Sequence, residues 1–246
     1  MRYPNYLLTI LVYFLTFSED VASDSFRYNS YNNHGVVGLI NMPTARFYDS
    51  SVHGITLYNG NPDQKITLSS NPYDWLEASF FYTNIQGRSY CLEDFDFCNQ
   101  DYKDKGFNFK IRLKQEGVFP AIAIGVNDLA GTGLYGSEYI VGSYGINNFD
   151  MHFGIWWGVL NESNFSFSNP LSKIYSGFET RPANKVGYSG TGSFSAGRYF
   201  SGKSASPFFG LSYAINNNVL LKFEHDTTLT QERDDYKQSR IDYKLR

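Results

Sequence analysis

The chain has 246 residues, with 21 Lys and Arg against 24 Asp and Glu, a length that fits one domain or one barrel. A formal net charge of -3 gives no basic field, so we expect no nucleic-acid partner. Aromatic residues make up 18 % of the chain, which argues against disorder and against a coiled coil. A mean hydropathy of -0.36 argues against a bundle of membrane helices, but β-barrel strands are only half apolar and stay possible.

The N-terminal residues 1–23 have the pattern of a secretory signal peptide. Arg2 precedes an apolar run from Leu7 to Phe17, and Val21 and Ser23 offer the small residues of a cleavage site. As a helix this run would cover about 17 Å, too short for a ~30 Å hydrocarbon core, so we expect cleavage rather than anchoring. The predicted mature chain has an N-terminal segment over 24–54 and a β-domain over 55–246.

Two cysteines, Cys91 and Cys98, lie in the polar stretch 86–104. In an exported chain such a pair predicts one local disulfide that closes a loop. The alternative of a zinc site lacks a nearby histidine to complete the ligands. We expect neither a metal nor another cofactor.

From Ile55 onward, short segments of period two alternate with clusters of Gly, Asn, Asp, Ser and Pro, which is typical of an all-β protein. The clearest strand is 107–114, where Phe107, Phe109, Ile111 and Leu113 face one way and Asn108, Lys110, Arg112 and Lys114 face the other. The other predicted strands are 55–59, 65–69, 76–83, 121–128, 139–146, 149–157, 193–200, 206–215, 219–226 and 241–246.

The links between these strands differ in length. Short turns at 145–148 and 216–218 predict antiparallel hairpins, whereas the links 86–105 and 161–192 are long and polar. An outer-membrane barrel has short turns on one rim and long loops on the other. A soluble sandwich would show the same alternation, because its apolar face is hidden between two sheets.

Three features favour the barrel over the sandwich. Aromatic residues occur near strand ends, charges recur on the presumed inner face, and the chain is exported. We predict an antiparallel up-and-down barrel or partial barrel of roughly 10–12 strands, with its apolar face toward lipid. The charged inner residues are Glu77, Lys110, Arg112, Lys114, Lys222, Glu224, Asp242 and Lys244. They would hydrate the interior, or form a path for a polar glycan that stacks on loop aromatics such as Tyr90, Tyr102 and Tyr175.

The segment Gly38-Leu39-Ile40-Asn41-Met42-Pro43-Thr44-Ala45-Arg46 resembles the opening motif of the YjbH family. Similar likeness continues through 104–113, 120–129, 131–135 and 137–141. The resemblance implies an outer-membrane protein associated with exopolysaccharide production and related to the GfcD capsule-export components. Family members are longer and often lipoprotein-like, so the chain resembles their N-terminal part and lacks the lipidation cysteine.

Candidate site residues come from this motif and from one glycine-rich turn. Pro43 fixes its own φ and keeps Met42 extended, so Gly38, Asn41, Pro43 and Thr44 predict an ordered turn or plug near the barrel mouth, whose expected role is packing the first strand. Arg46 is expected to be solvated, with a luminal carboxylate as the alternative partner. Gly131-Thr132-Gly133 lacks a dinucleotide fingerprint and predicts a tight turn, with Glu138 as a candidate lumen residue.

No enzyme is predicted. The histidines His34, His53, His152 and His225 form no recognisable nucleophile–base motif, although His225 and His152 are the residues that a hydrolase would need. The expected partners are the outer-membrane bilayer, polysaccharide and other export components. The alternatives are a small-solute, porin-like channel and an exported, soluble carbohydrate-binding sandwich.

Overall fold

The computed structural model describes residues 29–60, 63–89, 100–131, 133–158, 165–182, 196–216 and 218–225, with the side chains of 88 and 89 left aside. The predicted signal peptide, the Cys91–Cys98 pair, Thr132 and the predicted strand 241–246 lie outside the described residues. The described part of the chain contains no helix with the length and apolarity needed to cross a membrane.

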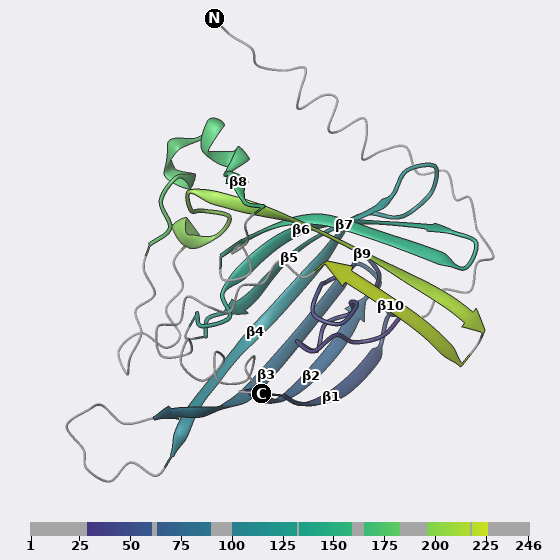
Figure 1. Ribbon diagram of the computed structural model, residues 1–246, viewed down its shortest axis with the longest axis horizontal. Helices are drawn as coiled ribbons and strands as arrows, with labels where there is room; N and C mark the ends of the chain where they lie inside the picture. The colour runs from purple at the N-terminus through teal and green to yellow at the C-terminus, as the bar shows by residue number, and fades with distance from the viewer. Residues whose placement is uncertain are drawn as a thin grey trace, which may run out of the picture.

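One antiparallel sheet dominates the described residues (Figure 1). Its strands pair in the order β1-β2-β3-β4-β5-β6-β7-β9-β10, so nearly every strand lies beside its neighbour in sequence. The bounds are β1 Val52–Asn59, β2 Asp63–Tyr73, β3 Leu76–Ser89, β4 Asp101–Lys114, β5 Ala121–Leu129, β6 Ser137–Ile146, β7 Phe149–Gly158, β9 Ser204–Asn216 and β10 Val219–His225. The short β8, Phe167–Ser168, pairs with the start of β9.

This architecture confirms the predicted all-β, up-and-down antiparallel fold of about ten strands. β1 and β10 are not paired with each other among the described residues, so the sheet is an open, curved wall. Of the two predicted forms, barrel or partial barrel, this is the partial barrel. The described strands form one layer, whereas a sandwich requires a second sheet over the apolar face.

The two rims of the wall differ as predicted. Short turns join β2 to β3, β6 to β7, and β9 to β10 on one rim, and Asn147 takes a φ of 52° in the middle turn. The long links between β3 and β4 and between β7 and β9 lie on the other rim. β3 and β4 extend well into the predicted link 86–105, and their hairpin projects beyond the neighbouring strands (Figure 1).

Alternation along the strands sorts side chains onto two unlike faces. On β4 the predicted pattern holds, because Phe107, Ile111 and Leu113 are exposed while Asn108 and Lys110 are buried. The outer, convex face carries exposed apolar residues on almost every long strand: Ile55, Leu57, Ile66, Leu68, Tyr82, Phe107, Ile111, Leu113, Phe149, Met151, Phe153, Phe209, Leu221 and Phe223. The inner, concave face is polar over much of its area and is covered by the N-terminal segment.

Two parts of the predicted pattern are wrong. The predicted strand 193–200 is a 3-10 turn, η3, over Ala196–Arg198 in its described part. The predicted loop 161–192 contains β8 and two 3-10 turns, η1 (Pro170–Lys173) and η2 (Ser176–Phe178). Together, residues 165–182 and 196–203 form a small unit, here called the cap, at the long-loop end of β6, β7 and β9 (Figure 1). Polar hydrogen-bonding residues such as Asn169 hold the cap together without period-two alternation.

Candidate functional site in the concave face

Residues 29–48 fold into a compact segment, here called the plug, against the concave face of the wall. Isolated bridges pair Tyr31 with Val37 and Gly38 with Pro43, so the predicted motif forms an ordered turn. Asn32 organises this turn: its side-chain oxygen accepts hydrogen bonds from the backbone N–H of His34 and Val36, and its amide donates to the carbonyl of Asn41 at 2.9 Å. Such a side chain replaces the backbone partners that a strand would supply.

Apolar side chains anchor the second half of the plug. Met42, Ala45 and Phe47 are buried in one cluster with residues from the middle strands of the wall, namely Ala121, Ala123, Tyr139, Val141, Trp156 and Phe208. The rings of Trp156 and Phe208 pack with centroids 4.5 Å apart. The plug therefore contributes part of the hydrophobic core, and it packs on the middle of the sheet rather than only on the first strand.

A buried ion pair holds the first half of the plug. Lys110 Nζ lies 2.5 Å from Glu77 Oε2, with side-chain exposures of 0 % and 1 %. Glu77 Oε1 accepts a hydrogen bond from the backbone N–H of Val37 at 2.7 Å, and Lys110 donates to the carbonyls of Val37 and Arg46 at 3.1 and 2.8 Å. Both charges thus bind plug backbone as well as each other.

Arg46 is largely covered and paired, so the expectation of a solvated arginine is wrong and the alternative, a carboxylate on the inner face, is confirmed. Its Nε and one terminal nitrogen donate to the two oxygens of Asp150 at 2.8 and 2.6 Å, and Glu116 forms a second ion pair. Burial disfavours the charged guanidinium, but the hydrogen bonds and charge of Asp150, with Glu116, outweigh that effect and raise the pKa of Arg46.

Beside this pair, Ser143, His152 and Asp150 lie in a row. Ser143 Oγ is 2.8 Å from His152 Nδ1, and His152 Nε2 is 3.7 Å from Asp150 Oδ2. The order is that of a hydrolase triad. However, Ser143 is fully buried beneath the plug, and its oxygen accepts a hydrogen bond from Ala45 N–H at 2.8 Å. In this arrangement the three side chains position the plug.

The last anchor comes from β10. The carboxylate of Glu224 accepts hydrogen bonds from three successive backbone N–H groups, those of Ile40, Asn41 and Met42, at 2.9 to 3.1 Å. Lys222 donates to the carbonyls of Gly38 and Leu39 at 3.2 and 2.7 Å. Successive amides that converge on one anion form a nest, so the turn Gly38–Pro43 is clamped by opposite charges at its donor and acceptor ends.

Glycines allow the plug to approach the wall closely. Gly35 has a φ of +74°, and a Cβ there would collide with the side chain of Thr67 on β2. Gly210 on β9 leaves room for Leu39, which a larger residue would displace. The left-handed turn at Gly35 and the close contact at Gly210 both require a residue without a side chain.

The structure brings together Gly38, Asn41, Pro43, Thr44 and Arg46, as predicted for one ordered segment. Thr44 is buried, and its Oγ1 accepts a hydrogen bond from Arg46 N–H at 3.3 Å. Gly131 and Gly133 lie apart from the plug, in the turn that joins β5 to β6, next to Asp128 and Arg198 respectively. The predicted turn is therefore confirmed for its described residues.

Glu138 does not line the interior, so that expectation is wrong. It pairs across the sheet with Val126 and Trp157 and shares their outer face, where the cap buries it. Arg181 donates to both of its oxygens at 2.8 Å, and Phe200 N–H donates at 2.8 Å. The sequence prediction missed this cap contact, as well as the plug contacts of Asp150 and Ser143. Asp150 lies between the outward residues Phe149 and Met151, an alternation that does place it on the inner face.

Comparison with known proteins identifies the group to which this wall and plug belong. The family described as exopolysaccharide biosynthesis protein YbjH, the YjbH family, matches residues 30–244. The chain belongs to the YjbH family. It is 32 % identical over 199 residues to the uncharacterized lipoprotein YjbH of Escherichia coli (strain K12). That match covers 80 % of this chain and 28 % of the relative, so the chain spans well under half of the relative's length. No solved structure matches the chain.

Proposed function

We propose that this YjbH-family chain is an outer-membrane wall with an internal plug, and that it acts in exopolysaccharide production or export. The family description supplies the exopolysaccharide link, and the relative's name as a lipoprotein supports an exported, membrane-associated protein. Placement of the wall in the outer membrane, cleavage of the signal peptide and passage of glycan are parts of the proposal.

The observation that carries the membrane placement is the exposure of the apolar face. Leu57 is 79 % exposed and Ile55 69 %, and exposed apolar residues recur on the same face across the wall. Soluble proteins rarely expose contiguous apolar patches beyond a few hundred Å². On the opposite face Glu77, Lys110 and Asp150 are buried in ion pairs, which fits a barrel with an apolar exterior and a polar interior.

A matched pair of substitutions on β1 tests the membrane placement in the whole gene product. Leu57→Lys places a charge on the outer face, and Thr56→Lys places the same charge on the inner face of the same strand. In lipid, the first change costs up to about 2–4 kcal/mol, depending on depth, and should deplete the protein from outer-membrane fractions, while the second should be tolerated. Normal recovery of both variants in the membrane fraction would refute the placement of this face in lipid, because an exposed site in water accepts lysine at little cost.

The glycan role needs a separate measurement. Deleting the gene should lower the amount of secreted polysaccharide, and re-expression of the native chain and of Thr56→Lys should restore it, whereas Leu57→Lys should not. An unchanged polysaccharide yield after deletion would overturn the role in exopolysaccharide. Conductance of small solutes in planar bilayers, without any change in polysaccharide, would favour the porin-like alternative.

A further inference from the structure

The cap packs against the outer face of the wall at the long-loop end of β6, β7 and β9 (Figure 1). Trp157 on β7 donates from its indole nitrogen to Asn169 at 2.9 Å, and Glu138 on β6 binds Arg181. Asn169 also donates to the carbonyls of Phe178, Phe200 and Gly202 at 3.0 to 3.1 Å, which ties both parts of the cap together. The cap is therefore an ordered unit fixed at a defined level of the wall.

This position has an electrostatic consequence. Glu138 is a fully buried carboxylate on the face that carries exposed apolar residues elsewhere. A carboxylate that faces hydrocarbon is costly, and the cap both shields it and supplies its counter-charge. The cap thus marks the level at which the outer face stops being purely apolar, which in a membrane protein is the boundary with the headgroups.

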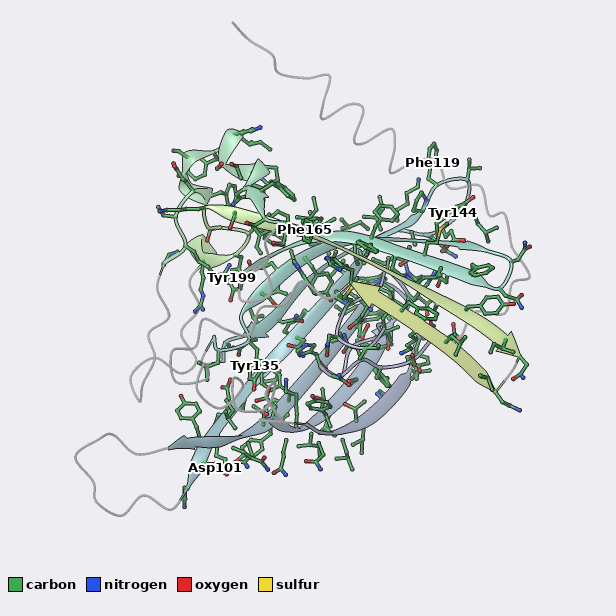
Figure 2. All side chains as sticks on the ribbon, viewed as in Figure 1. Asp101, Phe119, Tyr135, Tyr144, Phe165 and Tyr199 are labelled. Atoms are coloured by element: carbon green, nitrogen blue, oxygen red, sulfur yellow. The ribbon has the colours of Figure 1, made fainter. Side chains whose placement is uncertain are left out.

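The exposed surface of the cap has the composition of that boundary. Ile174 and Tyr175, between η1 and η2, are 78 % and 66 % exposed, and Phe165, labelled in Figure 2, is 65 % exposed. Among its described residues the exposed charges are Lys173 and Lys203 against one acid, Glu179, while Arg181 is neutralised by Glu138. Aromatic and apolar tips beside lysine and arginine are the features of segments that lie in the interface of an anionic membrane.

We propose that the cap is an interfacial anchor, which inserts Ile174 and Tyr175 among the headgroups of an anionic bilayer leaflet while its lysines contact lipid phosphates. This inference rests on the proposed membrane placement of the wall and adds to it a lipid-contact site and an orientation. The long-loop end of β6, β7 and β9 lies at one membrane surface, and the outer face of the wall continues from there into the hydrocarbon.

Spin-label depth measurements test the anchor. Single cysteines are placed at Ile174, at Leu57 on the wall and at Gln86 in the projecting β3–β4 hairpin, in the full chain with Cys91→Ser and Cys98→Ser. The labelled proteins are reconstituted in vesicles of phosphatidylethanolamine and phosphatidylglycerol. We expect a label at 57 to be reached by oxygen and not by a water-soluble nickel chelate, a label at 86 to show the reverse, and a label at 174 to be intermediate, with nickel access several-fold below that at 86.

The outcomes separate the anchor from the wall. If the label at 57 is buried in lipid but the label at 174 is as accessible to nickel as the label at 86, the anchor is refuted and the wall is not. Full access of the nickel chelate to a label at 57 would also refute the proposed placement of the wall in the membrane. Where the cysteine background fails to assemble, Ile174→Trp in the otherwise native chain gives the same information: added fluorescence quenched by lipids brominated near the headgroup supports the anchor, and quenching only by aqueous iodide overturns it.

The lipid charge requirement is tested by Lys173→Gln with Lys203→Gln. Each basic residue near an anionic surface is worth about fivefold in binding. The double variant should therefore raise nickel access at 174 in phosphatidylglycerol vesicles, and much less in pure phosphatidylcholine. The same depth for native and variant caps in both vesicles would overturn the role of lipid phosphates.

Discussion

Replacing Lys110 by methionine removes the buried charge that joins the wall to the plug. Methionine keeps most of the length of the side chain but leaves Glu77 without its ion-pair partner at 1 % exposure. It also removes the donor that binds the carbonyls of Val37 and Arg46. Breaking a buried pair from one side costs roughly 3–5 kcal/mol, because the remaining charge is uncompensated. We expect Lys110→Met to lower the free energy of unfolding by that amount.

The pair also predicts non-additivity. Glu77→Gln in the Lys110→Met background removes the unpaired charge of Glu77 and keeps an acceptor for Val37 N–H. The double variant should therefore lose about 2–3 kcal/mol less stability than the two single variants lose in sum. Lys105→Met, an exposed lysine on the same strand, is the matched control and should change stability by no more than about 0.5 kcal/mol.

Unfolding in urea and detergent micelles, followed by tryptophan fluorescence, measures these changes, since Trp156 lies in the cluster that includes the plug. Amide hydrogen exchange at Val37 distinguishes loosening of the plug from unfolding of the wall. A cost below about 1 kcal/mol for Lys110→Met, or strictly additive single effects, would refute the conclusion that this ion pair fixes the plug.

Three further changes test other contacts. Gly35→Ala should destabilise the plug by more than Gly87→Ala, because both glycines have positive φ but only Gly35 meets a neighbour; equal losses in urea unfolding would contradict this. Arg46→Gln should cost about 2–3 kcal/mol and increase proteolytic cleavage of the plug, and unchanged cleavage would refute its anchoring role. Arg181→Gln should leave buried Glu138 without a counter-charge and destabilise the cap by about 3 kcal/mol, with partial recovery on adding Glu138→Gln. Unchanged hydrogen exchange at the Phe200 amide would contradict this prediction.

The strands and their faces could be predicted because the signal is local. On β7 and over 107–114 of β4 every second side chain is apolar, and the structure places those residues on one face. β6 shows where this logic ends. Tyr139 and Val141 face the plug cluster while Glu138 lies beneath the cap, so both faces of that strand are buried and alternation no longer reports the environment of either.

The plug could be predicted as ordered but not placed. Its motif shows a turn through Pro43, yet the partners of that turn are far away in sequence: Glu224 lies 183 residues from Asn41, and Asp150 lies 104 residues from Arg46. Pairing a buried charge with its partner requires the curvature of the whole sheet, which no local pattern encodes. For the same reason the sequence around Arg46 predicts a solvated arginine and gives no sign of Asp150 as its partner.

The contacts that hold the plug also set the cost of moving it away from the concave face. Departure of the whole plug would expose Met42 and Phe47, at roughly 1.5–3 kcal/mol each, and would open the Trp156 and Phe208 surface that they cover. It would also strip Lys110 and Glu77 of their backbone partners. A small-solute channel that opens by expelling the plug is therefore strongly disfavoured. The turn at Gly38–Pro43 is held by polar contacts to Lys222 and Glu224 and by buried Met42, so movement of this turn alone would break fewer contacts than departure of the whole plug.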